Sequence, residues 1–152
     1  MPEEKKSKNA GRRENRAAAM QFIYMREING DTPVADALEA FFSSKENGRQ
    51  FYPFAEELIA GVEAHRAEID KVISESATNW STDRIAKVDL AILRLAVFEL
   101  LFRDDIPPVV SINEAVDLAK EYSSAEARRF VNGVLDRVRG TLKRPSRTAN
   151  KK

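Results

Sequence analysis

Two groups of side chains have the chemistry to hold RNA. They are Arg12, Arg13 and Arg16 in one group, and Arg128, Arg129, Phe130 and Asn132 in the other. Guanidinium groups offer planar, multidentate donors to phosphate, and an aromatic ring beside them can stack on an unpaired base. A phenylalanine at helical spacing is more often part of a core, and basic segments also serve solubility. These residues alone therefore leave both interpretations open.

The charge is unevenly distributed along the 152 residues, although the net charge is only +1. Residues 1–16 carry a net charge of +3, residues 17–119 carry −9 and residues 120–152 carry +7. An acidic middle between basic ends indicates two surfaces with different partners, and the basic ends suit a phosphate backbone.

The side chains typical of catalysis are nearly missing. Cysteine is absent and His65 is the only histidine, which excludes disulfides, thiolate chemistry and a histidine cluster for a metal. Neighbouring carboxylates such as Glu56 and Glu57 should point apart on a helix and be solvated. No apolar run approaches the roughly 20 residues of a membrane helix, and no hydrophobic segment follows the charged N-terminus. We expect a soluble, cytoplasmic protein that is not an enzyme and has no cofactor or metal.

Apolar residues recur at intervals of three and four almost throughout, which predicts an all-α fold, a compact helical bundle. Helices are expected over about 12–28, 33–42, 52–76, 85–102, 111–122 and 123–142. Their predicted N-caps include Thr32, Ser111 and Ser123, the last two in capping boxes with Glu114 and Glu126. Residues 1–10 and 143–152 are polar and basic and are expected to be a disordered arm and tail, which leaves 11–142 as the folded domain.

Polar residues at apolar positions need partners. Arg94 and Glu99 interrupt the apolar helix at 85–102, and each is expected to form a structural ion pair because an unpaired buried charge is costly. Asn132 and Gly133 lie inside the last helix, where both are unfavourable. We expect Gly133 to let a neighbouring helix approach. For Asn132 we expect two roles: satisfying a buried polar group and facing RNA.

Four segments in the C-terminal half form an ordered set of motifs. They read VDLAILRLAVFEL at 88–100, DIP at 105–107, INEAVDLAK at 112–120 and FVNGVLD at 130–136. The first helix adds an arginine-rich opening followed by Gln21 and Tyr24. Together these features resemble the NusB family of bacterial transcription antitermination factors over about residues 12–142.

The resemblance implies about seven helices, arranged as two three-helix halves plus an extra helix, and a noncatalytic role. Proteins of this family bind the boxA element of nascent RNA together with NusE, a ribosomal protein of the small subunit. The complex helps RNA polymerase to resist termination, chiefly during ribosomal RNA synthesis. A homodimer of the free protein is an open alternative, because NusB-like proteins vary in oligomeric state.

The resemblance assigns RNA contacts to Arg12, Arg13, Arg16, Arg129, Phe130 and Asn132, and NusE contacts to Tyr24, Ile28 and Asp89. Glu14 departs from the family pattern, which often has another basic residue there, so the RNA contribution of the first helix should be weaker. The two RNA-binding groups are expected to meet on one face. Two other functions stay open: a purely protein-binding adaptor, and an isolated domain of the kind that begins certain ribosomal RNA cytosine methyltransferases.

Overall fold

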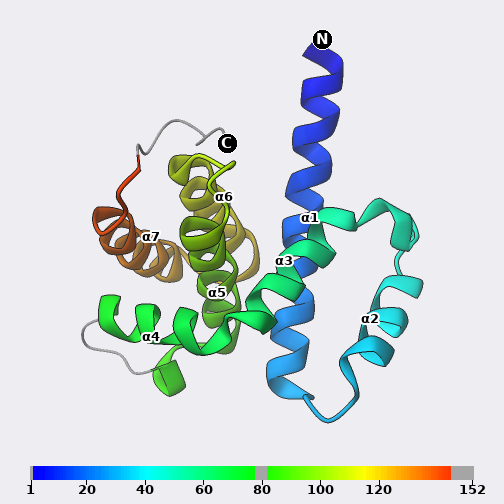
Figure 1. Ribbon diagram of the computed structural model, residues 1–152, viewed down its shortest axis with the longest axis horizontal. Coiled ribbons are helices and arrows are strands. Elements are labelled where there is room, and N and C mark those ends of the chain that lie inside the picture. Colours follow the sequence, from blue (N-terminus) through cyan, green and yellow to red (C-terminus); the bar gives the residue numbers. More distant parts are fainter. Residues whose placement is uncertain (1, 78–81, 145–152) are drawn as a thin grey trace. The chain divides into compact units, whose positions relative to one another are not determined.

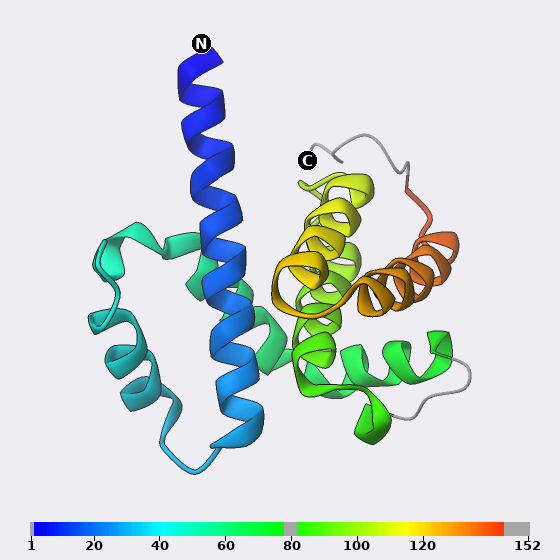
Figure 2. The same ribbon diagram turned by 180° about the vertical axis from the view of Figure 1, so that it is seen from behind.

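The computed structural model describes residues 2–77 and 82–144, with side chains from residue 11 onward. Within these residues the chain forms seven α-helices and two short 3₁₀-helices and contains no strand, which confirms the all-α prediction. The chain divides into two units, residues 1–60 and 61–152. The first holds α1 (Pro2–Ile28), α2 (Val34–Ser43), η1 (Arg49–Phe51) and most of α3 (Pro53–Ala64). The second holds α4 (Arg66–Ser76), η2 (Thr82–Arg84), α5 (Lys87–Phe102), α6 (Pro108–Tyr122) and α7 (Ala125–Gly140) (Figures 1 and 2).

Aromatic side chains form the core of the first unit. Phe22 of α1 and Phe42 of α2 are fully buried. The Phe42 ring lies 5.2 Å from that of Tyr52, and Phe22 meets Phe41 edge to face at 5.5 Å. Such pairs add to the stabilisation from burial alone. These rings therefore connect α1, α2 and the residue that precedes α3.

The side chain of Asn15 joins α1 to the start of α3. Its Oδ1 accepts a hydrogen bond from the Ala55 amide at 2.9 Å, and its Nδ2 donates to the carbonyl oxygens of Phe51 at 3.1 Å and Gly11 at 2.7 Å. The Ala55 amide belongs to the first turn of α3, where amides have no acceptor within the helix. Asn15 therefore caps a helix distant in sequence.

Helix α1 begins at Pro2, earlier than the expected start at about residue 12, and it includes residues 2–10 of the segment that was expected to be a disordered arm. The segment PEEKKSKNA is rich in glutamate and lysine, which are good helix formers, and it starts with proline, which is tolerated at a first helical position. Thr32 is not the cap of α2. Pro33 takes that position with an extended ψ of 140°, and its carbonyl oxygen accepts from the Ala37 amide.

The single helix predicted over 52–76 is two helices, because the backbone leaves the helical conformation at His65 (φ −118°, ψ 22°). The His65 ring stacks on that of Phe102, with the ring centroids 4.0 Å apart. The apolar spacing continues on both sides of this one residue. For this reason the break could not be read from periodicity.

Helix α5 is the central helix of the second unit and packs against α4, α6 and α7. It is buried continuously from Asp89 to Leu100. Arg94 forms a two-pronged ion pair with Asp70 of α4, at 2.9 and 3.0 Å, which confirms the predicted ion pair. Glu99 accepts a hydrogen bond from the buried Ser111 hydroxyl at 2.8 Å. None of the helices in the described parts of the chain is long and apolar enough to cross a membrane.

The two predicted capping boxes are both misplaced. Helix α6 starts at Pro108, before Ser111, because proline suits a first turn whose amides lack partners. The Ser111 hydroxyl is therefore available to Glu99. At α7, Ser124 rather than Ser123 is the N-cap. Its backbone is extended and its Oγ accepts from the Ala127 amide at 3.0 Å.

Arg144 shows that the C-terminal segment is not wholly a disordered tail. Its guanidinium donates to the carbonyl oxygens of Ile106 at 2.8 Å and Leu100 at 3.0 Å. A cation is favourable at the end of α5, where carbonyl groups lack helical donors. The remainder of the predicted tail, residues 145–152, lies outside the described residues.

Gly61 of α3 is the glycine that a close contact requires. A Cβ atom added to Gly61 would lie 2.1 Å from Cζ of Phe98 on α5. The Phe98 ring is 6% exposed, and its centroid is 5.7 Å from that of Phe102. Glycine at this position therefore lets Phe98 reach the backbone of α3.

Candidate nucleic-acid interface

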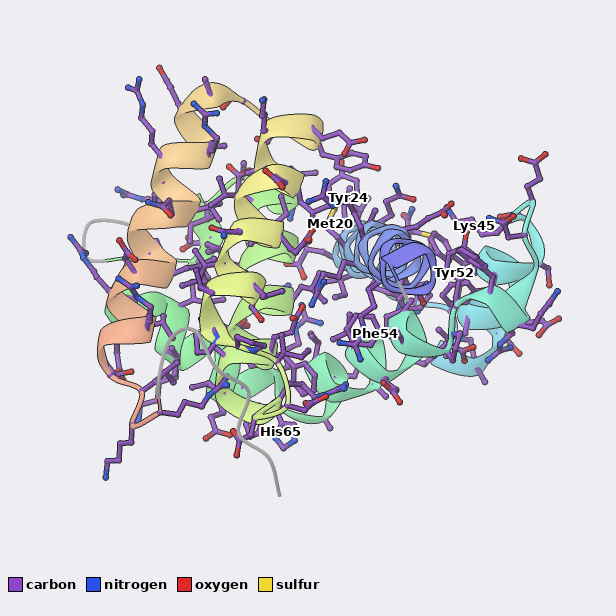
Figure 3. The ribbon with its side chains drawn as sticks, turned by 90° about the horizontal axis from the view of Figure 1, so that it is seen from above. Met20, Tyr24, Lys45, Tyr52, Phe54 and His65 are labelled. Atoms are coloured by element: carbon purple, nitrogen blue, oxygen red, sulfur yellow. The ribbon has the colours of Figure 1, made fainter. Side chains whose placement is uncertain are left out.

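The three α1 arginines that were predicted to bind RNA have different surroundings. Arg13 is exposed, Arg12 is partly buried and Arg16 is only 4% exposed. The guanidinium carbons of Arg12 and Arg16 lie 4.4 and 5.2 Å from the centre of the Phe54 ring, which is labelled in Figure 3. A cation over a ring is a stabilising contact. Arg12 and Arg16 therefore have structural contacts in the first unit, and Arg13 is the most exposed of the three. RNA binding by this group stays a prediction.

Helix α7 presents Arg129 and Asn132 to solvent. Their spacing of three places them on one face of the helix. Phe130 is partly buried and lies on a neighbouring face of the helix. Backbone amides in the first turn also favour anions. The face that carries Arg129 and Asn132 is thus accessible to a phosphate backbone, and RNA binding by this face stays a prediction.

Asn132 and Gly133 do not have the structural roles expected of them. Both are exposed, and a Cβ atom added to Gly133 would find no heavy atom within 4 Å. No helix in the described residues approaches this glycine, and Asn132 does not serve a buried polar group. The residues that dock α7 on the unit are instead Val131, Val134 and Leu135. These three residues recur at intervals of three and four, so they share one face of α7, which lies away from the face that carries Arg129 and Asn132.

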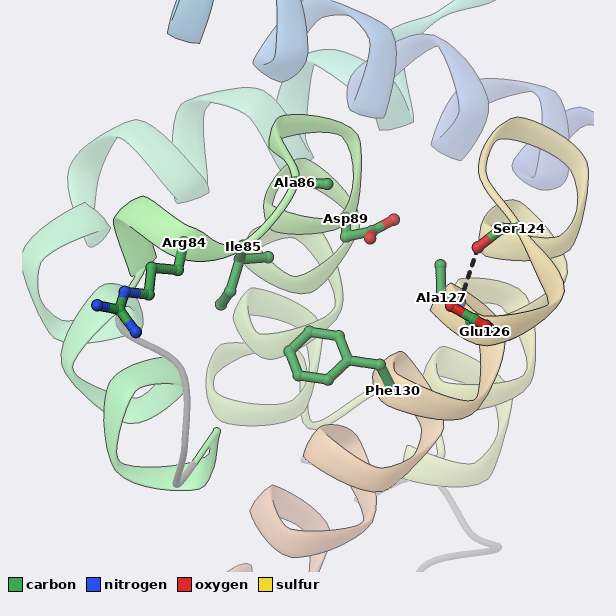
Figure 4. Close-up of a pocket in the computed structure, with 8 residues that line it drawn as sticks. All are labelled: Arg84, Ile85, Ala86, Asp89, Ser124, Glu126, Ala127 and Phe130. Carbon is green, nitrogen blue, oxygen red and sulfur yellow. Dashed lines mark hydrogen bonds between the residues drawn. The ribbon is translucent and has the colours of Figure 1, made fainter.

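A cavity of about 400 Å³ lies in the second unit, between α5 and the start of α7. Its lining residues are Arg84, Ile85, Ala86, Asp89, Ser124, Glu126, Ala127 and Phe130. Figure 4 shows the Phe130 ring and the Asp89 carboxylate reaching toward this space from two different helices. Asp89 was assigned to NusE and Phe130 to RNA, yet the two residues line the same cavity.

The three residues assigned to NusE have unlike environments. Tyr24 and Ile28 belong to the first unit; Tyr24 is partly buried, whereas Ile28, the last residue of α1, is 48% exposed. Asp89 belongs to the second unit and is 8% exposed. A group that contacts Asp89 must therefore enter the cavity. A shared NusE surface stays a prediction.

Sequence reasoning missed Arg84, Ser124 and Glu126 as neighbours of Asp89 and Phe130. Arg84 comes from the 3₁₀-helix η2, and Ser124 and Glu126 come from the start of α7. Only the packing of α5 against α7 brings these segments together. The Ser-x-x-Glu spacing of Ser123 and Glu126 marked the start of α7, although one residue too early. It was the one sequence signal that pointed to these neighbours.

Comparison with known proteins agrees with the architecture. The family model of the NusB family matches residues 13–139. The transcription antitermination protein NusB of Myxococcus xanthus is 45% identical over 138 residues, which cover 88% of this chain and 98% of the relative. That of Geotalea uraniireducens is 43% identical over 141 residues, with coverages of 88% and 97%.

Solved structures give the same result. A structure of T. maritima NusB matches with a TM-score of 0.78 and 34% identity, covering 88% of this chain and 93% of that one. A chain from a crystal structure of the antitermination factors NusB and NusE in complex with double-stranded RNA also has a TM-score of 0.78. It is 29% identical, with coverages of 88% and 98%.

The described residues form seven α-helices with exposed basic positions and a cavity lined in part by an aromatic ring and a carboxylate, an arrangement typical of an all-α binding protein. The chain belongs to the NusB family and is a transcription antitermination protein of that family. This membership confirms the predicted noncatalytic role. The alternative of an isolated methyltransferase-type domain is disfavoured, because the relatives are antitermination proteins of nearly the same extent as this chain.

Proposed function

We propose that this protein binds boxA-type RNA together with NusE in the cytoplasm and thereby helps RNA polymerase to resist termination, chiefly on ribosomal RNA transcripts. The observation that carries the proposal is the match to a NusB chain solved with NusE and RNA, of which 98% is covered by this chain. Because 88% of this chain is covered, the match extends over both units.

The RNA contacts in this proposal come from both ends of the chain. Arg13, Arg129 and Asn132 are exposed and supply the first contacts with the phosphate backbone. Arg12 and Arg16 add positive charge beside Phe54, and Phe130 adds a ring that a base can reach. In the proposal, the α1 and α7 groups contact the same RNA. Their positive charge would also speed the encounter with RNA.

NusE binding is assigned to Tyr24, Ile28 and Asp89. An exposed isoleucine at the end of a helix, next to a tyrosine on the same helix face, is the kind of apolar and aromatic contact that protein interfaces use. The same proposal includes association with the antitermination complex of RNA polymerase. Light scattering of the purified chain would show whether the free protein is a monomer or a homodimer.

Fluorescence anisotropy with labelled RNA tests the proposal. The chain with NusE should bind a boxA single strand more tightly than a scrambled strand of equal composition, and the preference should weaken when NusE is omitted. A boxA duplex serves as a third probe, since the related complex holds double-stranded RNA. Equal affinity for boxA and scrambled strands in the presence of NusE would contradict the proposal. Intact NusE affinity with no RNA affinity would favour the purely protein-binding adaptor.

A further inference from the structure

The dipeptide Asn-Gly occurs three times in this chain, at Asn29–Gly30, Asn47–Gly48 and Asn132–Gly133. Asparagine before glycine is especially prone to lose its side-chain amide, because glycine has no Cβ to hinder attack by its own backbone nitrogen on the asparagine side chain. The reaction also needs a backbone that can bring the two groups together and a glycine amide that no acceptor holds. The three pairs differ on both points.

Two of the three pairs are held in place. Asn132–Gly133 lies inside α7, where each amide donates to the carbonyl oxygen four residues earlier. In Asn47–Gly48, the glycine amide donates to the carbonyl oxygen of Lys45 at 3.1 Å, and the asparagine Nδ2 donates to Oε1 of Glu14 at 3.5 Å. Attack by either glycine nitrogen would first have to break a hydrogen bond, and in α7 it would also have to unwind the helix.

Asn29–Gly30 has different surroundings. Both residues are exposed and follow the last residue of α1, in the connection to α2 (Figure 1). The Asn29 amide donates to the Met25 carbonyl oxygen at 2.8 Å, whereas the Gly30 amide has no acceptor among the described residues. An amide in an exposed turn, without an acceptor in the protein, can lose its proton to water and reach the neighbouring side chain.

We propose that Asn29 is a site of spontaneous deamidation and that the products weaken the binding of NusE to this end of α1. The Gly30 nitrogen, after losing its proton to water, forms a bond to Cγ of Asn29, and the side-chain nitrogen takes a proton from water and leaves as ammonia. Water then opens the resulting cyclic succinimide at either of its carbonyl groups, which gives aspartate or isoaspartate. The loss of NusE affinity rests on the proposed function, whereas the deamidation itself does not.

Each product changes the end of α1. Ile28, which is assigned to NusE, directly precedes Asn29 and is 48% exposed. A carboxylate at position 29 lies at the negative end of the helix dipole, and isoaspartate also lengthens the backbone by a methylene group. The guanidinium of Arg26 donates to the Thr32 carbonyl oxygen across this turn. The new carboxylate would compete for that guanidinium, because hydrogen bonds between two charged groups are stronger. The turn beside the NusE residues should therefore change conformation.

Peptide mapping by mass spectrometry tests the modification. The purified full chain is kept folded at neutral pH for several weeks, and isoaspartate is detected by enzymatic methylation of its carboxyl group. Amide loss should be at least about tenfold faster at Asn29 than at Asn132, because the helical pair must first unfold locally. In guanidinium chloride, where the fold no longer distinguishes the pairs, the rates should become similar. Equal rates at Asn29 and Asn132 in the folded chain would overturn the inference.

Calorimetric titration with NusE tests the consequence. Aged protein and Asn29→Asp should bind NusE about threefold more weakly than fresh protein. Asn29→Gln should keep its affinity through the same ageing, because the longer side chain closes a ring far more slowly. Unchanged NusE affinity in aged, deamidated protein would refute the consequence. Fresh protein that does not bind NusE at all would contradict the proposed function as well.

Asn47→Asp is the matched control. It adds the same charge in another Asn-Gly pair of the first unit, beside Glu14 and therefore about 20 Å along α1 from Ile28. Its affinity for NusE should equal that of fresh wild-type protein. An equal loss of affinity in Asn47→Asp and Asn29→Asp would mean that net charge, rather than the end of α1, is responsible, and would overturn the assignment to Asn29. Circular dichroism establishes that each variant is folded.

Discussion

Gly61→Ala should destabilise the protein even though alanine is the better helix former. The added Cβ would lie 2.1 Å from Phe98 Cζ, whereas carbon atoms in contact are about 3.5–4.0 Å apart, so the ring would have to move by roughly 1.5 Å. The Phe98 ring is 6% exposed and lies in the stack with His65 and Phe102, which leaves it little room.

Overpacking of this kind costs about 1–3 kcal/mol, and the gain in helix propensity returns about 1 kcal/mol. Because the overlap is large, we expect a net loss of about 1–2 kcal/mol in the free energy of unfolding. Urea unfolding followed by far-ultraviolet circular dichroism measures this loss as a lower transition midpoint with an unchanged slope.

Gly133→Ala is the matched control, because it is the same change inside a helix but in open space. It should stabilise the protein by up to about 1 kcal/mol. Combining Gly61→Ala with Phe98→Leu should cost less than the sum of the two single changes, since the smaller side chain relieves the overlap. A Gly61→Ala protein as stable as the wild type, or more stable, would refute the reasoning.

Three other changes test separate parts of the account. Asp70→Asn should lower the free energy of unfolding by about 2–3 kcal/mol, because it removes the carboxylate that faces a guanidinium whose side chain is 5% exposed; a decrease below about 1 kcal/mol would mean that the pair contributes little. Ser124→Ala should cost about 1 kcal/mol in urea unfolding, whereas Ser123→Ala should cost much less, and equal costs would contradict the assigned cap. Replacing Arg12 and Arg13 together by alanine should make the affinity for single-stranded RNA less sensitive to salt. The slope of log affinity against log salt should fall in magnitude by about 0.7 for each phosphate that the protein no longer neutralises. An unchanged slope would place both side chains outside the RNA site.

Helix type was predictable from the sequence, but local detail was not. The apolar spacing that predicts α5 reflects a helix surrounded by neighbours, and that pattern is explicit in residues 88–100. The break at His65 leaves no trace in the spacing, because one non-helical residue preserves the apolar positions on either side. At Ser111 the capping pattern is present, yet the hydroxyl donates to Glu99, an interaction that depends on the packing of α5 against α6.

Some features of the candidate site were likewise predictable from the sequence, and others were not. The exposure of Arg129 and Asn132 follows from their places between the apolar positions of α7. Glycine was the more misleading residue: Gly133 was expected to make room for a helix, but Gly61 does so, and which glycine faces a ring is decided by tertiary packing. The cavity that joins Asp89 to Phe130 likewise exists only once α5 and α7 have packed.

Transcription in an extract that lacks its own NusB-family protein tests the central claim most directly. The template carries boxA upstream of a terminator, a second template carries a scrambled boxA, and NusE is present in both reactions. Adding this protein should increase the fraction of transcripts that pass the terminator on the boxA template, with little change on the scrambled template. An equal increase on both templates, or no increase on either, would contradict the claim.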